Sequence, residues 1–88
     1  MQHKPNFLLQ SVAGLNVVVP IHSETADFNG MLTFNDTGAF LWEKLDTPHT
    51  EAELVDALLD TFLVERDRAE ADVARFVEKL RTHNLLSD

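Results

Sequence analysis

The sequence predicts an α+β fold in which a three-stranded antiparallel sheet comes first and three helices follow. The main observation is a change of period: side chains alternate between two faces over residues 31–34, and apolar residues recur at helical spacing after residue 36. A strand therefore runs straight into a helix. The second observation is that β-branched runs precede this point and amphipathic segments follow it, so strands can pair with the stretch and helices can cover it.

Two strands are expected before this point, joined as a hairpin. Residues 7–12 form a short apolar run, and residues 15–21 are rich in β-branched side chains. Gly14 marks the turn between them. Pro20 cannot donate to a strand ladder, so it places that end of the second strand at an edge or a bulge. The largely polar residues 22–29 are expected to form a connecting loop.

The third strand is expected over residues 31–35. Leu32 and Phe34 would point toward the core. Met31 and Thr33 would point to the opposite face, as in a strand that is covered on one side only.

The first helix should begin at Asn35 and Asp36, whose side-chain oxygens can accept hydrogen bonds from the free N–H groups of a helix start. It should run from about residue 36 to 45 and end before Pro48, because proline cannot continue a helix. Trp42, the only tryptophan, is expected in the core between this helix and the third strand.

The second helix is expected to begin with a capping box, in which Thr50 and Glu53 each satisfy a backbone N–H of the other. An amphipathic pattern at i, i+3 and i+4 follows this start. The residues of the pattern are Leu54, Val55, Leu58, Leu59 and Phe62.

The third helix is expected after a turn at residues 63–66, with Asp67 as its cap and Glu70 completing a second capping box. It should end near residues 83–84, and the leucines at 85 and 86 should fold back onto the core. Its apolar stripe consists of Ala69, Val73, Phe76, Val77 and Leu80.

Length and composition describe one small domain, residues 1–88, and favour a binding module over an enzyme, because so short a chain has little stability to spare for a catalytic cavity. The net charge of -8 opposes attraction to nucleic acid or to anionic membranes. Cysteine is absent, which excludes disulfides and thiolate metal sites. No apolar run approaches the roughly 18 residues of a membrane span. The expected location is the cytoplasm.

Motifs for catalysis, metals or cofactors are missing from the sequence. The four histidines, at 3, 22, 49 and 83, are far apart, and they are expected to be exposed to solvent without a metal role. The three glycines cannot form a dinucleotide or phosphate-binding fingerprint. No catalytic residue, metal ligand or cofactor site is therefore predicted.

Positive charge is concentrated in one place. On a helical wheel Arg68, Arg75 and Lys79 lie within about 40° of each other, beside the apolar stripe. Asp72 falls in the same stripe and can pair locally with both arginines, which is worth roughly 0.2–0.5 kcal/mol a pair. The alternative is that the unpaired part of the stripe receives an acidic peptide or, as a second choice, a phosphate. The basic residues in or just before the third helix are Arg66, Arg68, Arg75, Lys79 and Arg81.

Residues 30–45, 50–55 and 71–80 resemble the PqqD family, whose domains are also called RiPP recognition elements. The resemblance is clear from residue 30 to 86 and plausible over 7–21. It implies a winged helix-turn-helix arrangement and a non-catalytic peptide chaperone. Such a chaperone binds the leader of a ribosomally made precursor peptide and presents it to a modifying enzyme, a radical SAM enzyme in the pyrroloquinoline quinone (PQQ) pathway.

The resemblance also implies where the peptide binds. The third strand would have an open edge that a peptide extends by backbone hydrogen bonds. The groove would lie between this strand and the third helix, and its acidic and apolar ligand would meet the basic stripe there. The candidate contacts are Met31, Leu32, Thr33, Phe34, Asn35, Arg68, Asp72, Arg75, Phe76 and Lys79.

Other interpretations remain open at this point. A winged-helix DNA-binding regulator would share the fold order and the basic third helix, although residues 7–21 hold no Lys or Arg. A structural or regulatory subunit without a peptide ligand is a second alternative. The closest pathway members carry a cysteine-containing turn where residues 46–48 stand, so the identity of the peptide pathway stays open, as does the oligomeric state.

Overall fold

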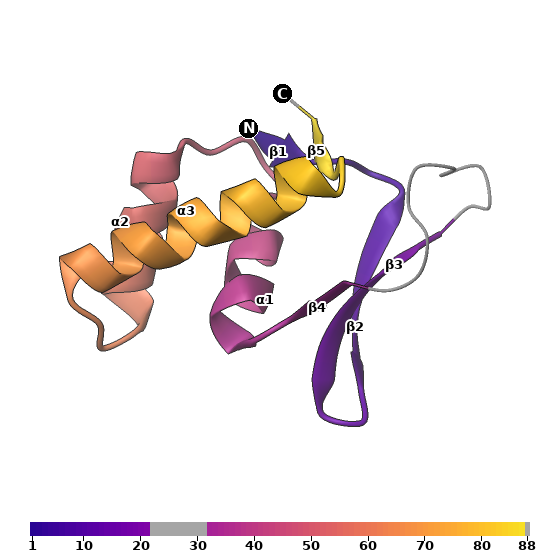
Figure 1. Cartoon of the computed structure of the whole chain (residues 1–88), viewed down its shortest axis with the longest axis horizontal. Helices are drawn as coiled ribbons and strands as arrows, with labels where there is room; N and C mark the ends of the chain where they lie inside the picture. The colour runs from indigo at the N-terminus through magenta and orange to yellow at the C-terminus, as the bar shows by residue number, and fades with distance from the viewer. Residues whose placement is uncertain (22–31, 88) are drawn as a thin grey trace.

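The computed structural model describes residues 1–21 and 32–87. Figure 1 shows three helices gathered on one side and the long β2–β3 hairpin on the other, with β4 leading from the sheet into α1. The predicted α+β fold and its order of three strands and three helices are confirmed. The elements are β1 (Gln2–His3), β2 (Phe7–Val12), β3 (Leu15–Pro20), β4 (Leu32–Phe34), α1 (Asp36–Lys44), α2 (Glu51–Thr61), α3 (Arg66–Thr82) and β5 (Leu86–Ser87).

The main sheet is antiparallel, in the order β2-β3-β4. The hairpin turn has positive φ at both central residues, 52° at Ala13 and 81° at Gly14, as the tight turns that match the twist of a hairpin require. Pro20 pairs with β2 beyond the part of β3 that pairs with β4, so its missing N–H costs the β3–β4 ladder nothing. The predicted loop at residues 22–29 lies outside the described residues.

The helix starts agree with two of three predictions. Asn35 caps α1, because its side chain accepts the backbone N–H of Gly38 at 2.8 Å. The capping box of α2 is complete: the Glu53 N–H donates to Thr50 Oγ1 at 3.1 Å, and the Thr50 N–H donates to the Glu53 carboxylate at 2.8 Å. That hydrogen bond from the Thr50 backbone lowers the pKa of Glu53 below its ordinary value.

The predicted start of α3 is wrong. The helix begins earlier, with Glu65 at the N-cap, and it has no side-chain cap hydrogen bond. The Ala69 N–H donates to the Glu65 carbonyl at 2.9 Å, which draws Asp67 into the first helical turn. There its carboxylate faces the positive end of the helix dipole and does not act as a cap.

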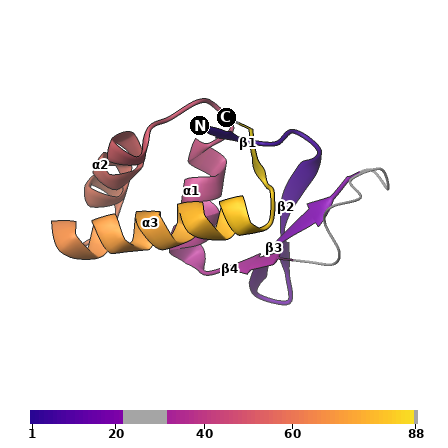
Figure 2. The same cartoon turned by 45° about the horizontal axis from the view of Figure 1, so that its top comes forward.

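A small second sheet joins the two ends of the described chain. β1 pairs antiparallel with β5, and Figure 2 shows the N- and C-terminal segments side by side over one end of α1. His3 lies on Trp42 with ring centroids 4.1 Å apart and the planes 1° from parallel. Because the His3 side chain is only 10% exposed, the expectation that it would be free in solvent is wrong.

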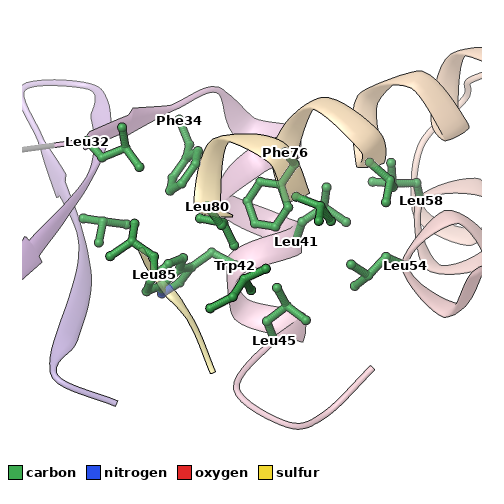
Figure 3. Packing of buried hydrophobic residues seen from close by; sticks show 14 of the residues in the cluster. Leu32, Phe34, Leu41, Trp42, Leu45, Leu54, Leu58, Phe76, Leu80 and Leu85 are labelled. Atoms are coloured by element: carbon green, nitrogen blue, oxygen red, sulfur yellow. The ribbon is translucent and has the colours of Figure 1, made fainter. Parts of the chain in front are cut away.

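The hydrophobic core lies between the main sheet and the helices. Trp42 is 3% exposed, so its predicted burial is confirmed. Figure 3 shows Phe34, Phe76 and Leu41 grouped around α3, with Leu54 of α2 farther along the same layer. The return of residues 85 and 86 to the core is also confirmed, since both leucines are buried.

Candidate functional site

A groove lies where the end of β4, the first turns of α1 and one face of α3 meet. Its volume is about 320 Å³. Seven of the predicted contact residues line it: Phe34, Asn35, Arg68, Asp72, Arg75, Phe76 and Lys79. α1 adds three residues that the sequence did not implicate, Thr37, Gly38 and Leu41.

Aromatic side chains form the floor of the groove. The rings of Phe34 and Phe76 both line the groove, and their centroids are 5.4 Å apart. The buried Trp42 ring lies 6.1 Å from that of Phe34. Phe34 fits because position 38 is a glycine: a Cβ on Gly38 would stand 2.9 Å from the Phe34 side chain. A glycine in a first helical turn, four residues after an aromatic side chain, is the signal that could have predicted this contact.

A polar junction holds the corner at which β4 turns into α1. The side-chain amide of Asn16, on β3, donates to the Phe34 carbonyl at 3.3 Å and to an Asp36 carboxylate oxygen at 3.2 Å. Together with the Asn35 cap, this junction fixes the direction in which β4 enters the helix. One wall of the groove is therefore fixed by local hydrogen bonds.

Charged side chains from α3 form the rim of the groove. Arg75 donates to Asp72 at 2.6 Å and Arg68 donates to the same oxygen at 3.3 Å, so the predicted local pairing is confirmed. Asp72 is 19% exposed, whereas both arginines are more than 70% exposed. With three cations and one anion in its lining, the groove carries two positive charges in a chain whose net charge is -8.

Lys79 reaches across the groove to β4. Its Nζ donates to the Thr33 carbonyl at 2.7 Å and lies 5.0 Å from the centre of the Phe34 ring. Successive residues of an antiparallel strand direct their backbone groups to opposite edges, and the N–H and C=O of one residue share an edge. Since β3 pairs with one edge of β4, the Thr33 carbonyl that meets Lys79 lies on the other edge, and the Thr33 N–H does too.

Two of the remaining predicted contacts, Leu32 and Thr33, do not line the groove with their side chains. The Leu32 side chain is in the hydrophobic core, 8% exposed. The Thr33 side chain is exposed, so only its backbone faces α3. Met31 lies outside the described residues.

Within residues 1–21 and 32–87, no three His, Asp or Glu side chains come together as a metal site would require. None of the helices in these ranges combines the length and the apolar composition that a bilayer crossing needs.

Comparisons with known proteins place this fold. A solved structure described as "TbiB1 in Complex with the TbiA(beta) Leader Peptide" matches with a TM-score of 0.71 and 20% identity, over 100% of each chain. Another, "Lasso peptide synthetase B1 complexed with the leader peptide", matches with a TM-score of 0.72 and 23% identity, over 99% of this chain and 96% of that one.

Sequence comparison adds the family. No curated protein matches the sequence. The family model described as "Coenzyme PQQ synthesis protein D (PqqD)" matches residues 16–86, which is most of the chain and includes β4, α1 and α3. The groove and every element that forms it fall within this match, and the chain belongs to the PqqD family.

Proposed function

We propose that this protein binds the leader segment of a ribosomally synthesised precursor peptide and presents it to a modifying enzyme, without catalysing a reaction itself. The observation that carries the proposal is a groove with an aromatic floor and a positive rim beside the outer edge of β4. Family membership supports it, and so do the two solved structures of the same fold, both of which are described as complexes with leader peptides.

The peptide would bind by adding a strand to the sheet. Backbone hydrogen bonds to Thr33 would supply affinity that depends little on side chains. Apolar leader side chains would pack on Phe34 and Phe76, and acidic ones would meet the cations of α3. Eight of the ten predicted contacts are retained in this proposal, Thr33 and the seven that line the groove, with Thr37, Gly38 and Leu41 added from the groove. Leu32 is not retained, because its side chain lies in the core, and Met31 stays a prediction outside the described residues.

The DNA-binding alternative gains nothing from these contacts. DNA recognition needs a broad basic surface that meets many phosphates, whereas the groove carries only two positive charges in a chain whose net charge is -8. The hairpin that would act as a wing spans residues 7–21 and contains no charged residue. The comparisons give no support to this alternative either.

The partner enzyme in this proposal is a radical SAM enzyme or another enzyme that modifies peptides, as the description of the family as a PQQ synthesis protein supports. Because precursor peptides are made on ribosomes, the proposed place of action is the cytoplasm. The biosynthetic pathway that the protein serves depends on which leader peptide it binds. The groove would select that peptide by its acidic and its apolar side chains.

Titration of the ¹⁵N-labelled protein with the leader segment of its genuine precursor peptide tests the proposal. Backbone amide signals of β4 and of the groove-facing part of α3 should shift, because strand addition creates hydrogen bonds at one and side-chain contacts at the other. Shifts confined to the β2–β3 hairpin or to the turn before α3 would contradict this placement of the site.

A single substitution sharpens the test. Thr33→Pro removes an N–H that faces outward, so the fold should survive while peptide binding weakens. Thr33→Val is the matched control, because it keeps the N–H and suits a strand. Equal affinities of the two variants would exclude a hydrogen bond from the Thr33 N–H to the peptide.

A further inference from the structure

Within the described residues, β4 offers an incoming strand one outward-facing residue. β4 consists of three residues, Leu32–Phe34, and its two end residues direct their backbone groups toward β3 if the middle one faces outward. Thr33 is the middle residue, and its carbonyl accepts the Lys79 ammonium at 2.7 Å. The acceptor that a strand-adding peptide needs first is therefore already occupied in the free protein.

Lys79 is held by this carbonyl and by an aromatic face. Its Nζ lies 5.0 Å from the centre of the Phe34 ring, and the side chain is half-buried. In the described residues no carboxylate lies within 4 Å of it, because Asp72 on the same stripe pairs with the two arginines. The ammonium thus has no anionic partner among these groups once it leaves the strand edge.

We propose that Lys79 acts as a place-holder for the peptide: a bound strand displaces its ammonium from the Thr33 carbonyl, and an acidic side chain of that same peptide must then receive it. This inference rests on the proposed leader binding and adds a specificity rule to it. When a peptide without this acidic side chain binds, the hydrogen bond of Lys79 to Thr33 is broken and no new partner replaces it. Binding of such a peptide is weakened, because a charged group without a partner is costly beside apolar surface. Lys79 therefore selects by exchange and not by attraction alone.

The geometry also gives the position of the acid. Residues that pair across two antiparallel strands send their side chains to the same face, and successive residues alternate between faces. The Thr33 side chain is exposed and points away from the groove, so the peptide residue opposite it does too. The next peptide residue, the one that lies alongside Phe34, would point into the groove, where Lys79 lies over the Phe34 ring. The acidic side chain is expected at this residue.

Replacement of Lys79 by methionine separates exchange from attraction. Lys79→Met keeps an unbranched apolar stem over Phe34 and removes only the ammonium. If Lys79 merely attracts acidic peptides, a neutral peptide binds wild type and variant equally. If Lys79 holds the place of the strand, the neutral peptide binds the variant more tightly, by about two- to fivefold. This is the effect expected when the peptide no longer has to displace one partly exposed, charge-assisted hydrogen bond.

The experiment uses two peptides and three proteins. The peptides are the leader segment of the genuine precursor and the same leader with its Glu and Asp residues replaced by Gln and Asn. The proteins are wild type, Lys79→Met and Lys44→Met. Lys44 is the matched control, because its Nζ also lies over a phenylalanine ring, at 5.4 Å from the centre of Phe40, but it is outside the groove lining. Affinities are measured by calorimetry at physiological salt.

We expect Lys79→Met to bind the neutral leader more tightly than wild type and the acidic leader more weakly, so that discrimination between the two is lost. Lys44→Met should match wild type with both. Unchanged affinity of Lys79→Met for the neutral leader, or tight wild-type binding by a leader with no acid at the residue alongside Phe34, would overturn the inference while the proposed function stands. Failure of wild type to bind either leader would instead overturn the proposed function, and the exchange with it.

A measurement without peptide tests the contact itself. The ¹³C shift of the Thr33 carbonyl should change in Lys79→Met, because its hydrogen bond is lost, and should stay constant in Lys44→Met. An unchanged shift in Lys79→Met would show that the edge carbonyl is not occupied in solution, which would contradict the place-holder role.

Discussion

Both ends of α1 carry a buried aromatic ring that contacts a second side chain, but one end lies beside an open groove and the other is covered by the paired strands β1 and β5. At the N-terminal end Phe34 packs on the helix with the Lys79 ammonium over its ring, and the groove beside it is open. At the C-terminal end Trp42 packs under the His3 ring, and there β1 and β5 pair with each other. The His3 backbone N–H also donates to the Leu45 carbonyl at 3.2 Å, so a free carbonyl of the helix end is satisfied.

The difference separates stability from binding. At the C-terminal end of α1, the closed end, the hydrogen bonds are made within the chain. Changes there should alter the free energy of unfolding and leave peptide affinity unchanged. At the N-terminal end the Thr33 carbonyl is held by the Lys79 side chain alone, so changes of the exposed rim side chains should act mainly on affinity. Changes under the buried Phe34 ring should alter both stability and affinity. The four predictions below test this separation, in decreasing order of expected effect.

Trp42→Ala should lower the free energy of unfolding by about 3–5 kcal/mol, the usual cost of removing a buried aromatic side chain. Urea unfolding followed by circular dichroism measures the loss. The wild-type tryptophan should show the fluorescence of a buried indole. A wild-type emission spectrum typical of exposed tryptophan would contradict the packing of the closed end.

Gly38→Ala should destabilise the fold by about 1–3 kcal/mol and also weaken peptide binding, because the new Cβ would press on Phe34 and force the groove floor to move. Phe34→Leu in the same chain should restore part of the loss by making room. Thermal unfolding of both single variants and the double variant gives the coupling energy. Additive losses would show that the two positions do not meet.

Arg75→Glu combined with Lys79→Glu should weaken binding of an acidic leader roughly tenfold at low salt, and less at high salt, because exposed charges are screened. The fold should survive, since neither side chain lies in the core. Lys44→Glu combined with Arg66→Glu makes the same change of net charge outside the groove lining and is the control. Similar losses in both pairs would mean that the overall charge acts, and not the rim.

His3→Ala should cost about 0.5–1.5 kcal/mol of stability, the contribution expected of a stacked aromatic pair, and leave peptide affinity unchanged. His3→Phe keeps a ring on Trp42 and loses the hydrogen bond to Asp46, so it divides the two contributions. Denaturant midpoints give the stabilities and calorimetry gives the affinities. A change of affinity in either variant would show that the two ends of α1 are coupled.

Local patterns predicted much of this molecule from the sequence. The bounds of β2, the Asn35 cap, the capping box of α2 and the pairing of Asp72 with its arginines all depend on residues fewer than seven positions apart. The predicted start of α3 was wrong although it is also local. The helix begins with a backbone hydrogen bond from the Ala69 N–H to the Glu65 carbonyl, and it has no side-chain cap that the sequence could reveal.

The rest depended on the tertiary structure. β1 and β5 are two residues long, so they carry no period, and only their meeting makes them strands. Glycine at position 38 was a readable signal for the contact with Phe34, but only the packing of β4 against α1 and α3 made that contact the floor of a groove. Spacing placed Lys79 on the correct stripe of α3, but its partner is a backbone carbonyl 46 residues away. A sequence fixes the angle at which a side chain leaves its helix, whereas the strand edge that it meets is set by how the sheet and the helix pack together.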